Sequence, residues 1–278
     1  MRRLIVNADD LGMNPARSHG IFQCFEQGIV RSASLIANGS HADTAAKWAR
    51  EKGLSCGLHV NLTEDFPLST VSDIETLVKP SGMFHEREEL KRLLENGDVD
   101  PLHIEREVRM QMEWCLDKYG QPSHVNGHDG IHVHPFIVPI LIPILERYAV
   151  RFTRIRNEQP LPPFGYVITE EEVERARRTG EEAEAARPLY RAHGIESTDH
   201  FRGLTLHGNA SKKNLRHILS RLPEGTTELM VHPGSQAGYG TPFDLDPQRQ
   251  TELNMLTDEA LPELLHQLGI ELCSFDEL

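Results

Sequence analysis

Cysteine is scarce in this sequence of 278 residues, which contains only four. No two of them have the C-x-x-C spacing of a zinc ribbon, and four scattered cysteines do not make a disulfide framework. Three of the four have apolar neighbours in the sequence. We therefore expect reduced thiols in the core at Cys24, Cys56, Cys115 and Cys273.

Basic residues and long apolar runs are also few. The chain has 29 lysines and arginines against 42 acidic residues, which gives a formal net charge of −13. A nucleic-acid partner is therefore not expected, because such a surface needs clustered basic residues. Only Leu4, Ile5 and Val6 precede the polar Asn7, too few for a signal peptide, and no run approaches transmembrane length. We expect a cytoplasmic protein with no membrane span.

Short β-like runs alternate with helical patterns along almost the whole chain. This alternation predicts a parallel sheet, and about eight units in 278 residues favour a TIM-like (β/α) barrel. The predicted strands are Leu4–Asn7, Ala33–Ala37, Cys56–Leu62, His124–Asn126, Phe152–Ile155, Leu204–Leu206, Glu228–His232 and Ile270–Ser274. Cap residues and periodicity predict helices over Pro15–Gln27, Asp43–Lys52, Ile104–Tyr119, Ser211–Arg221 and Asp246–Leu268.

Two segments interrupt this rhythm. Residues 66–100 contain several prolines and glycines with little periodicity, which indicates a long excursion that caps the site. Residues 169–187 form a dense run of glutamate and arginine, typical of a solvent-exposed helix, with a lid over the site as the alternative. Because we find neither a repeat nor a linker, residues 1–278 are predicted to form a single domain.

The clearest functional signal is the position of polar residues directly after apolar runs. Asp9 and Asp10 follow the first run, and His59, His128 and His232 each follow another. In βα-layered enzymes the carboxyl ends of the strands carry the active site. Carboxylates and imidazoles are metal ligands and proton-transfer groups. Four such placements together predict metal-assisted hydrolysis.

Each placement alone has a plainer interpretation. Asp9 and Asp10 also fit a turn before a helix, and a lone strand histidine such as His59 is more often a satisfied core residue. Asn61 and Thr63 share the face of His59, which favours a polar pocket. Four imidazoles fall within residues 124–134, and they cannot all bind one ion.

A consistent scheme joins these residues. One aspartate and two histidines make a three-ligand metal site with positions left for water and substrate. The neighbouring carboxylate deprotonates the water, and a separate histidine protonates the departing amine. Adjacent strand residues point to opposite sides, so we expect one of Asp9 and Asp10 to reach the metal and the other to face the water. A buried pair of carboxylates also needs a nearby cation.

These residues stand in motifs that span nearly the whole chain. They are LIVNADDLG at 4–12, RSASLI at 31–36, GLHVNLT at 57–63, VNGH at 125–128, HVHP at 132–135, GI at 194–195, DHFRG at 199–203 and ELMVHPG at 228–234. In this order and spacing they resemble the YdjC-like carbohydrate deacetylases, which include chitooligosaccharide deacetylase. The chain departs from the family at Leu11, where phenylalanine is usual, and at Gly130, where relatives often carry histidine. The second departure puts the contacts around the acetyl group or the sugar in question.

The resemblance implies a distorted (β/α) barrel related to polysaccharide deacetylases and hydrolysis of the N-acetyl group of an amino sugar. The implied cofactor is one divalent metal ion, with magnesium or zinc preferred among the ions that such a site accepts, and a homodimer is the implied assembly. Carried over to this chain, the implied metal ligands are Asp10, His59 and His128, the base is Asp9 and the acid is His232. Residues implied to bind substrate or support the site are Asn61, His132, His134, Arg154 (with Arg156 as the competing register) and Asp199.

Two other classes of function use similar residues. A metal-dependent amidohydrolase or phosphoesterase on a barrel is disfavoured, because neither a carboxylated-lysine candidate nor a second complete ligand set is evident. A non-catalytic metal- or sugar-binding protein would need no proton-transfer pair. Release of acetate from N-acetyl sugars separates the three.

Overall fold

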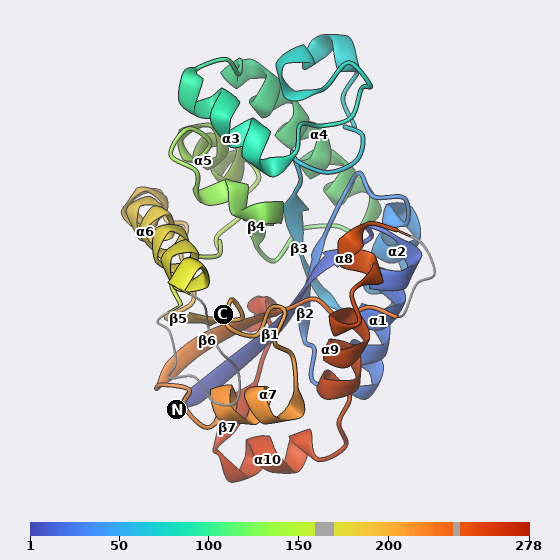
Figure 1. Ribbon diagram of the computed structural model, residues 1–278, viewed down its shortest axis with the longest axis vertical. Helices are drawn as coiled ribbons and strands as arrows, with labels where there is room; N and C mark the ends of the chain where they lie inside the picture. Colours follow the sequence, from blue (N-terminus) through green and yellow to red (C-terminus); the bar gives the residue numbers. More distant parts are fainter. Residues whose placement is uncertain (159–169, 236–239) are drawn as a thin grey trace.

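The centre of the molecule is one parallel sheet. The computed structural model describes residues 1–158, 170–235 and 240–278, and within them seven strands belong to this sheet (Figure 1). In spatial order they are β4 (Val125–Gly127), β3 (Ser55–Val60), β2 (Ser32–Leu35), β1 (Arg2–Leu11), β6 (Gly225–Val231) and β5 (His200–Arg202), with β7 (Ile270–Leu272) paired to β1. Within the described residues the path of paired strands runs from β4 to β5 without closing, so the expected distorted barrel is observed as a half barrel.

Strand β1 lies in the middle of the sheet and uses both of its edges. Its Arg2–Ala8 part pairs with β6, while the other edge pairs with β7 near the amino end and with β2 near the carboxyl end. The register shifts between Ala8 and Leu11, and Asp10 lies in this bulge with a left-handed φ of 68°. A bulge re-aims side chains that would otherwise alternate between the faces.

Ten α-helices lie around the sheet in the described part of the chain (Figure 1). They are α1 (Pro15–Gln27), α2 (Ala42–Lys52), α3 (Arg87–Asn96), α4 (Pro101–Lys118), α5 (Val138–Arg147), α6 (Glu170–Ala192), α7 (Lys212–Leu219), α8 (Pro242–Leu245), α9 (Gln248–Leu256) and α10 (Leu261–Gln267). Short 3₁₀ turns are η1 (Val71–Asp73), η2 (Glu75–Leu77), η3 (His128–Val133) and η4 (Phe275–Glu277).

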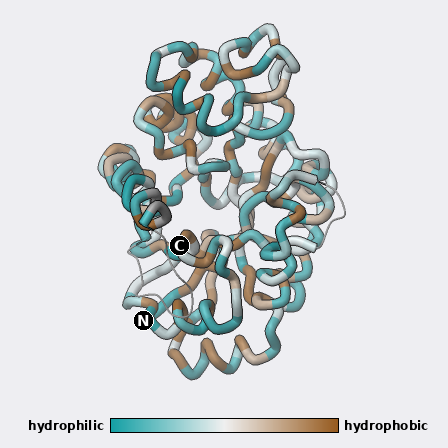
Figure 2. The backbone as a smooth tube through the Cα atoms, in the orientation of Figure 1, coloured by the Kyte–Doolittle hydropathy of each residue, from teal (hydrophilic) through white to brown (hydrophobic). Residues whose placement is uncertain are grey.

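The apolar core has two main parts. One lies between β1, β2, β6 and the helices α1, α2, α7, α9 and α10, and the other joins β3 and β4 to α3, α4, α5 and α6. In Figure 2 the apolar stretches accordingly follow the sheet and the inward sides of the helices. All four cysteines are free and buried, as expected. No helix within the described residues combines the length and apolar character that crossing a membrane requires.

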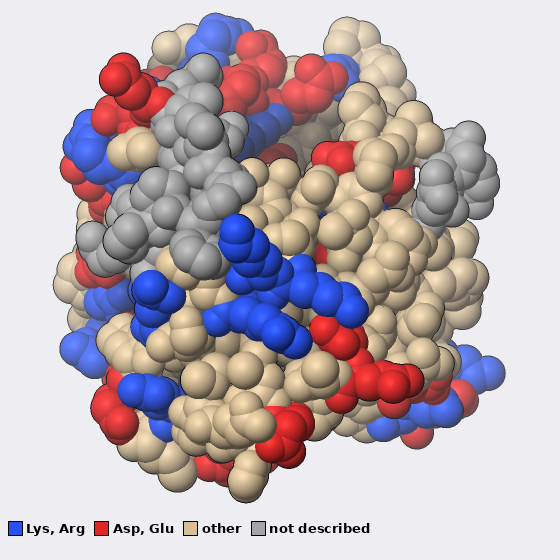
Figure 3. Space-filling view, turned by 60° about the horizontal axis from the view of Figure 1, so that its bottom comes forward, with Lys and Arg blue, Asp and Glu red and all other residues tan. Residues whose placement is uncertain are grey.

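The excess of acidic over basic residues is not distributed evenly over the surface. On the face shown in Figure 3, lysine and arginine side chains gather near the middle, and acidic side chains lie around them. The net charge of −13 therefore describes the chain as a whole and not each face.

The predicted helix caps are confirmed where the local signal is strong. Asn14 caps α1 by accepting a hydrogen bond from the backbone N–H of Arg17, and Pro15 takes the first helical position. Residues 66–100 contain α3, which the prediction missed, and the helix ends at Gly97 in a left-handed conformation.

Three other predictions are wrong in type or extent. Leu204–Leu206 is a turn, because the carbonyl of Gly203 accepts the N–H groups of Leu206 and His207, and the strand is His200–Arg202 instead. Phe152–Ile155 makes only isolated bridges, and the carbonyl of Arg154 accepts from a histidine side chain. The long helix over Asp246–Leu268 is broken between α9 and α10, where Pro262 occupies the first turn of α10.

Gly20 of α1 sets a testable packing limit near the sheet. A Cβ at this position would lie 2.5 Å from the Cα of Gly234, in the loop after β6. We expect Gly20→Ala to lower the free energy of unfolding by about 1–3 kcal/mol, the usual cost of overpacking. Gly180→Ala in α6 is the matched control. Its Cβ meets nothing closer than 3.4 Å, so helix propensity should raise stability by up to ~1 kcal/mol. Denaturant unfolding measures both, and an unchanged Gly20→Ala protein would contradict the expectation.

Candidate metal centre and active site

A cavity of about 380 Å³ lies at the carboxyl ends of the strands. Asp9 and Asp10 come from the end of β1, His59 from β3, His128 from the turn after β4 and His232 from the segment directly after β6. Parallel strands place their carboxyl ends at one edge, so residues far apart in sequence meet there. All five predicted centre residues line this one cavity.

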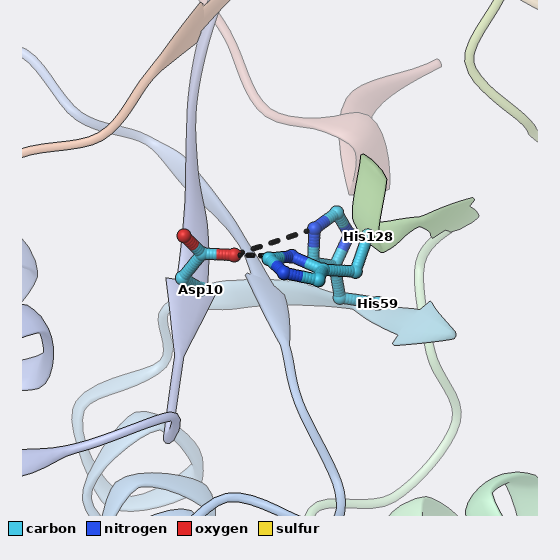
Figure 4. Close-up of side chains that lie close together, drawn as sticks. All are labelled: Asp10, His59 and His128. Carbon is cyan, nitrogen blue, oxygen red and sulfur yellow. Dashed lines mark hydrogen bonds and ion pairs between the residues drawn. The ribbon is translucent and has the colours of Figure 1, made fainter. Parts of the chain in front are cut away.

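Three of these residues form a compact group. One ligand-type atom from each of Asp10, His59 and His128 lies within 4.8 Å of the others. The Oδ1 atom of Asp10 is 3.5 Å from His59 Nε2 and 3.0 Å from His128 Nδ1, and both rings point toward the carboxylate (Figure 4). Among the described residues this is the single such group of three or more metal-binding side chains.

The hydrogen bonds of His59 fix the tautomer of its ring. Asn126 donates through Nδ2 to Ser34, so its Oδ1 must accept, and it lies 2.6 Å from His59 Nδ1. The proton of this ring is therefore on Nδ1, and the lone pair of Nε2 faces the carboxylate oxygen of Asp10. Two acceptors 3.5 Å apart repel, and a cation between them removes the repulsion. The donor set thus fits a divalent metal.

His128 is flanked by two carboxylates. Its Nδ1 faces Asp10, and its Nε2 lies 2.9 Å from Oε2 of Glu64. Burial opposes protonation of the ring, but Asp10 and Glu64 overcome it and hold the pKa of His128 well above its usual value. A carboxylate on the far nitrogen orients a histidine ligand and raises its basicity. Glu64 is therefore placed to support His128 as a ligand through Nδ1.

We expect Glu64→Ala to weaken metal binding by roughly 10–100-fold, the usual cost of losing such a supporting carboxylate. Glu64→Gln should lose less, because the amide oxygen can still accept the hydrogen bond from His128. Competition of the protein with a chelator for Zn²⁺ measures the affinity directly. Glu51→Gln, at an exposed position of α2, is the control for loss of one negative charge. Unchanged affinity in Glu64→Ala would contradict a supporting role.

Asp10 is held ionised by its neighbours. Arg17, from α1, lies 3.1 Å from Oδ2 of Asp10 and also contacts Asp244 at 2.7 Å. Burial raises the pKa of Asp10, but the positive charges of His128 and Arg17 lower it by more. The pKa of Asp10 therefore lies well below its usual value. The carboxylate is therefore charged and available to a cation.

Asp9 faces the same cavity as Asp10, which corrects the expectation that adjacent carboxylates point to opposite sides. The bulge in β1 turns both inward. Asp9 makes two hydrogen bonds with Arg154, at 2.6 and 2.7 Å, and a third with Asn7. Burial raises the pKa of Asp9, but Arg154, together with His59 and His232, lowers it far more.

Arg154 is itself held by two carboxylates. Besides its bonds to Asp9, it donates to Oε1 of Glu228 at 2.8 Å, and its side chain is almost fully buried. A forked pair of this kind fixes both position and charge. Asp9 therefore keeps one orientation and one charge state.

A buried polar network connects Asp9 with His59 beneath the cavity. Asn7 donates to both Asp9 and Ser34, and Ser34 also accepts from Asn126, the partner of His59. His124 Nε2 lies 3.2 Å from the same Ser34 oxygen. Satisfied networks of this kind rigidify a site. The network links the carboxylate of Asp9 on β1 to the imidazole of His59 on β3.

His232 stands on the other side of Asp9. Its Nε2 atom is 3.8 Å from Oδ2 of Asp9, and its backbone N–H donates to Glu252. His207 lies edge-on to its ring, with centroids 5.3 Å apart. Burial holds the pKa of His232 well below its usual value, against the pull of Asp10 and Asp9. The ring is therefore neutral in the free protein.

Of the remaining predicted residues, some line the cavity and others lie outside it. Arg154 and Arg156 both line the cavity, and Arg154 is the one that contacts Asp9. Asn61 lies behind the cavity and binds the backbone of Glu64, so it shapes that loop. His132 bonds the carbonyl of Arg154. His134 accepts from the backbone of Phe136. Neither imidazole belongs to the three-residue group.

Asp199 is not brought to the site. Its exposed carboxylate accepts the N–H of Thr226 near the amino end of β6, the end of the sheet opposite the cavity.

The two segments that interrupt the alternation of strands and helices, residues 66–100 and 169–187, contribute unequally to the cavity wall. Arg87 is the one residue of 66–100 among the described lining, whereas Val173, Ala176 and Thr179 of α6 present one helical face to the cavity.

Five contributors were missed by sequence reasoning: Asn7, Arg17, Glu64, Asn126 and Glu228. Glu64 directly follows the GLHVNLT motif, and Asn126 stands inside VNGH, so proximity to a motif could have found them. A glutamate inside a strand that is otherwise apolar is a signal for Glu228. Nothing local marks Arg17.

Comparisons with known proteins agree with this geometry. The model of the YdjC-like protein family matches residues 3–267. A mouse carbohydrate deacetylase is 34% identical over 302 residues, covering 99% of this chain and 94% of the relative. The carbohydrate deacetylase of Geobacillus stearothermophilus is 28% identical, with coverage of 99% and 98%.

Solved structures with the same fold are more distant in sequence. An Enterococcus faecalis V583 crystal structure, described as a candidate cellobiose-phosphate cleavage protein, aligns with a TM-score of 0.76 and 21% identity over 99% of this chain and 98% of that one. An uncharacterised protein of Agrobacterium tumefaciens C58 gives a TM-score of 0.53 and 10% identity, with coverage of 100% and 89%. These likenesses support the distorted barrel.

Proposed function

Because this chain belongs to the YdjC-like protein family, we propose that it is a metal-dependent carbohydrate deacetylase that removes the N-acetyl group of an amino sugar or oligosaccharide. The observation that carries the proposal is the compact Asp10–His59–His128 group beside the pair of Asp9 and His232. Three ligands supported by hydrogen bonds, with a base and an acid next to them, are the parts that amide hydrolysis needs.

Asp10, His59 and His128 would hold the metal. When bound, a divalent ion supplies Lewis-acid polarisation of the acetyl carbonyl and lowers the pKa of water. We propose zinc or magnesium. The two imidazoles favour zinc, because magnesium prefers oxygen ligands. Metal analysis of the purified protein tests this choice.

Asp9 acts as the general base. Arg154 and Asn7 hold its carboxylate ionised and facing the cavity, so it can accept a proton from the water that attacks the acetyl carbon. The ion pair also limits rotation of the carboxylate, which keeps the acceptor oxygen near the attacking atom.

His232 acts as the general acid. An amide nitrogen cannot leave as an anion, so it must gain a proton as the bond from carbon to nitrogen breaks. His232 starts neutral and receives the proton that Asp9 has taken from the attacking water, because its Nε2 lies 3.8 Å from Oδ2 of Asp9. The imidazolium then donates this proton to the departing nitrogen and returns to the neutral form. The products are acetate and the free amine of the sugar.

Acetate release from a panel of N-acetyl sugars, before and after removal of metal with a chelator, tests the proposal. Metal-dependent release from any sugar supports it. A two-metal phosphoesterase finds little support, since the described residues hold one group of three ligands. No acetate, together with hydrolysis of a phosphate ester, would overturn the proposal.

We also propose a cytoplasmic homodimer of single-domain subunits, on the basis of the family resemblance. Light scattering of the purified protein tests the assembly. Limited proteolysis tests the domain organisation, because a single domain should yield one resistant core.

A further inference from the structure

The imidazole of His232, the proposed acid, has no hydrogen bond to hold it within the described part of the chain. His232 stands directly after β6, beyond the last residue of that strand. Oδ2 of Asp9 is 3.8 Å from Nε2 of the ring, and His207 and Phe243 pack against the ring edge-on. None of these contacts fixes the direction of the imidazole as a hydrogen bond would. Its position therefore depends on the backbone of residue 232.

Two side chains of α9 hold this backbone. The N–H of His232 donates to Oε2 of Glu252, and the carbonyl of His232 accepts from Nη1 of Arg249 at 3.0 Å. The backbone of α9 adds a further bond, because the N–H of Gly234 donates to the carbonyl of Arg249 at 3.1 Å. Residues 232–234 are therefore tied to α9 on both sides of the His232 side chain.

Arg249 and Glu252 also bind each other. Nη2 of Arg249 lies 2.9 Å from Oε1 of Glu252, three residues along the helix, and the two side chains are only 3% and 2% exposed. A buried ion pair adds little net stability, because taking two charges out of water costs about as much as their attraction gains. What this pair supplies is a fixed donor for the carbonyl of His232 and a fixed acceptor for its N–H.

Arg249 supports the imidazole by a second route. Its guanidinium carbon lies 4.1 Å from the centroid of the Phe243 ring. The ring of Phe243 in turn packs edge-on to that of His232, with centroids 5.7 Å apart and an angle of 83° between the planes. One arginine thus holds both the carbonyl of His232 and an aromatic ring against which the imidazole packs.

Other contacts attach α9 to the molecule. Leu253 and Leu256 are buried in the same part of the core as α1, and the carbonyl of Leu256 accepts the N–H of Ile29. The helix is therefore anchored without the Arg249–Glu252 pair. Loss of the pair should release residues 232–234 and leave the helix in place.

We propose that Arg249 and Glu252 are positioning residues for His232, which hold its peptide groups on both sides and so set where the imidazole stands relative to Asp9 and the departing nitrogen. The inference rests on the proposed deacetylase function. Neither residue is among the described residues that line the cavity, so neither is placed to touch the substrate. A shift of the acid by about 1 Å can lower a rate by about 10²-fold.

The first test removes both charges together, because one charge left alone in the interior would threaten folding. Arg249→Met/Glu252→Leu should lower kcat for acetate release by roughly 10–100-fold, since misplacement of the acid affects the chemical step. KM and metal content should change little. An unchanged kcat in this folded double variant would overturn the proposal.

Conservative variants and a packing control accompany the double variant. Arg249→Lys keeps a donor for the carbonyl of His232, and Glu252→Gln keeps an acceptor for its N–H, so each should retain part of the rate that the double variant loses. Leu256→Ala loosens the packing of α9 in the core. It should lower stability and leave kcat of the folded protein unchanged. A kcat for Leu256→Ala as low as that of the double variant would contradict a specific positioning role.

The second test asks whether the effect passes through His232. In the His232→Ala background, Arg249→Met/Glu252→Leu should add almost nothing to the loss of kcat, because residues that act as a unit are not additive. A purely structural role of the pair would multiply the two losses in full, and that result would reject positioning of the acid.

Chemical modification separates failure of this inference from failure of the proposed function. Diethyl pyrocarbonate acylates neutral imidazoles, and mass spectrometry reports the rate at each histidine without turnover. His232 should react several times faster in the double variant, because its ring is no longer held, whereas the exposed His193 should react equally in both proteins. Faster reaction of His232 with no acetate from any sugar would support the positioning role and reject the deacetylase. Unchanged reaction with unimpaired acetate release would keep the deacetylase and reject the positioning role.

Discussion

Alanine at His59 is expected to remove the bound metal and to reduce acetate release to background while the protein stays folded. The same result is expected for Asp10→Ala and His128→Ala. Each change deletes one of the three proposed ligands, so the loss of metal affinity should exceed the roughly 10–100-fold cost of losing an outer partner. The three ligand-type atoms lie within 4.8 Å of one another, and the group has no fourth member among the described residues.

Metal content after dialysis, measured beside circular dichroism, checks this first prediction. His134→Ala is the matched control, because His134 lies outside the group and should retain both metal and activity. Full metal occupancy in any of the three ligand variants would reject that residue as a ligand.

The second large effect concerns the proton-transfer pair. Asp9→Asn and His232→Ala should each lower turnover by at least ~10²-fold, the usual contribution of a positioned base or acid. Metal content should persist in both, since neither side chain belongs to the ligand group. The double variant should be little worse than the poorer single variant, because the two residues act in one reaction.

Acetate release under single-turnover conditions, with metal content measured on the same samples, checks the pair. Asp9→Asn keeps the size of the side chain but leaves Arg154 with Glu228 as its one carboxylate, so stability should be measured as well. Near-normal turnover in either single variant with metal bound would show that another residue performs that step.

Local patterns predicted much of the fold. Parallel strands were expected at six of the seven places where the structure has them, and the missed one, β5, is three residues long. Short strands carry little pattern, and β5 directly precedes the apolar turn that was mistaken for it. The break between α9 and α10 shows a different limit, because one proline outweighed apolar periodicity that continued on both sides.

The candidate site, like the fold, could be predicted only in part from the sequence. Ligand-type residues after apolar runs can be recognised in the sequence because parallel strands place their carboxyl ends together, whatever lies between them. The direction of each carboxylate cannot be recognised in this way. Alternation predicts opposite faces for Asp9 and Asp10, and the bulge with its left-handed Asp10 reverses that outcome.

By itself the sequence determined the family, the parallel α/β architecture and the set of residues that gather at one edge of the sheet. Those features follow from local periodicity and from motifs that spacing preserves. Only the tertiary structure decided which charges are balanced. Arg17 and Arg154 meet carboxylates from distant elements, whereas Arg156 fills the space over Gly130 and, among the described residues, donates a hydrogen bond to the backbone carbonyl of Asp129. Ion pairing depends on distances of a few ångströms between elements far apart in the chain, and no local pattern encodes those distances.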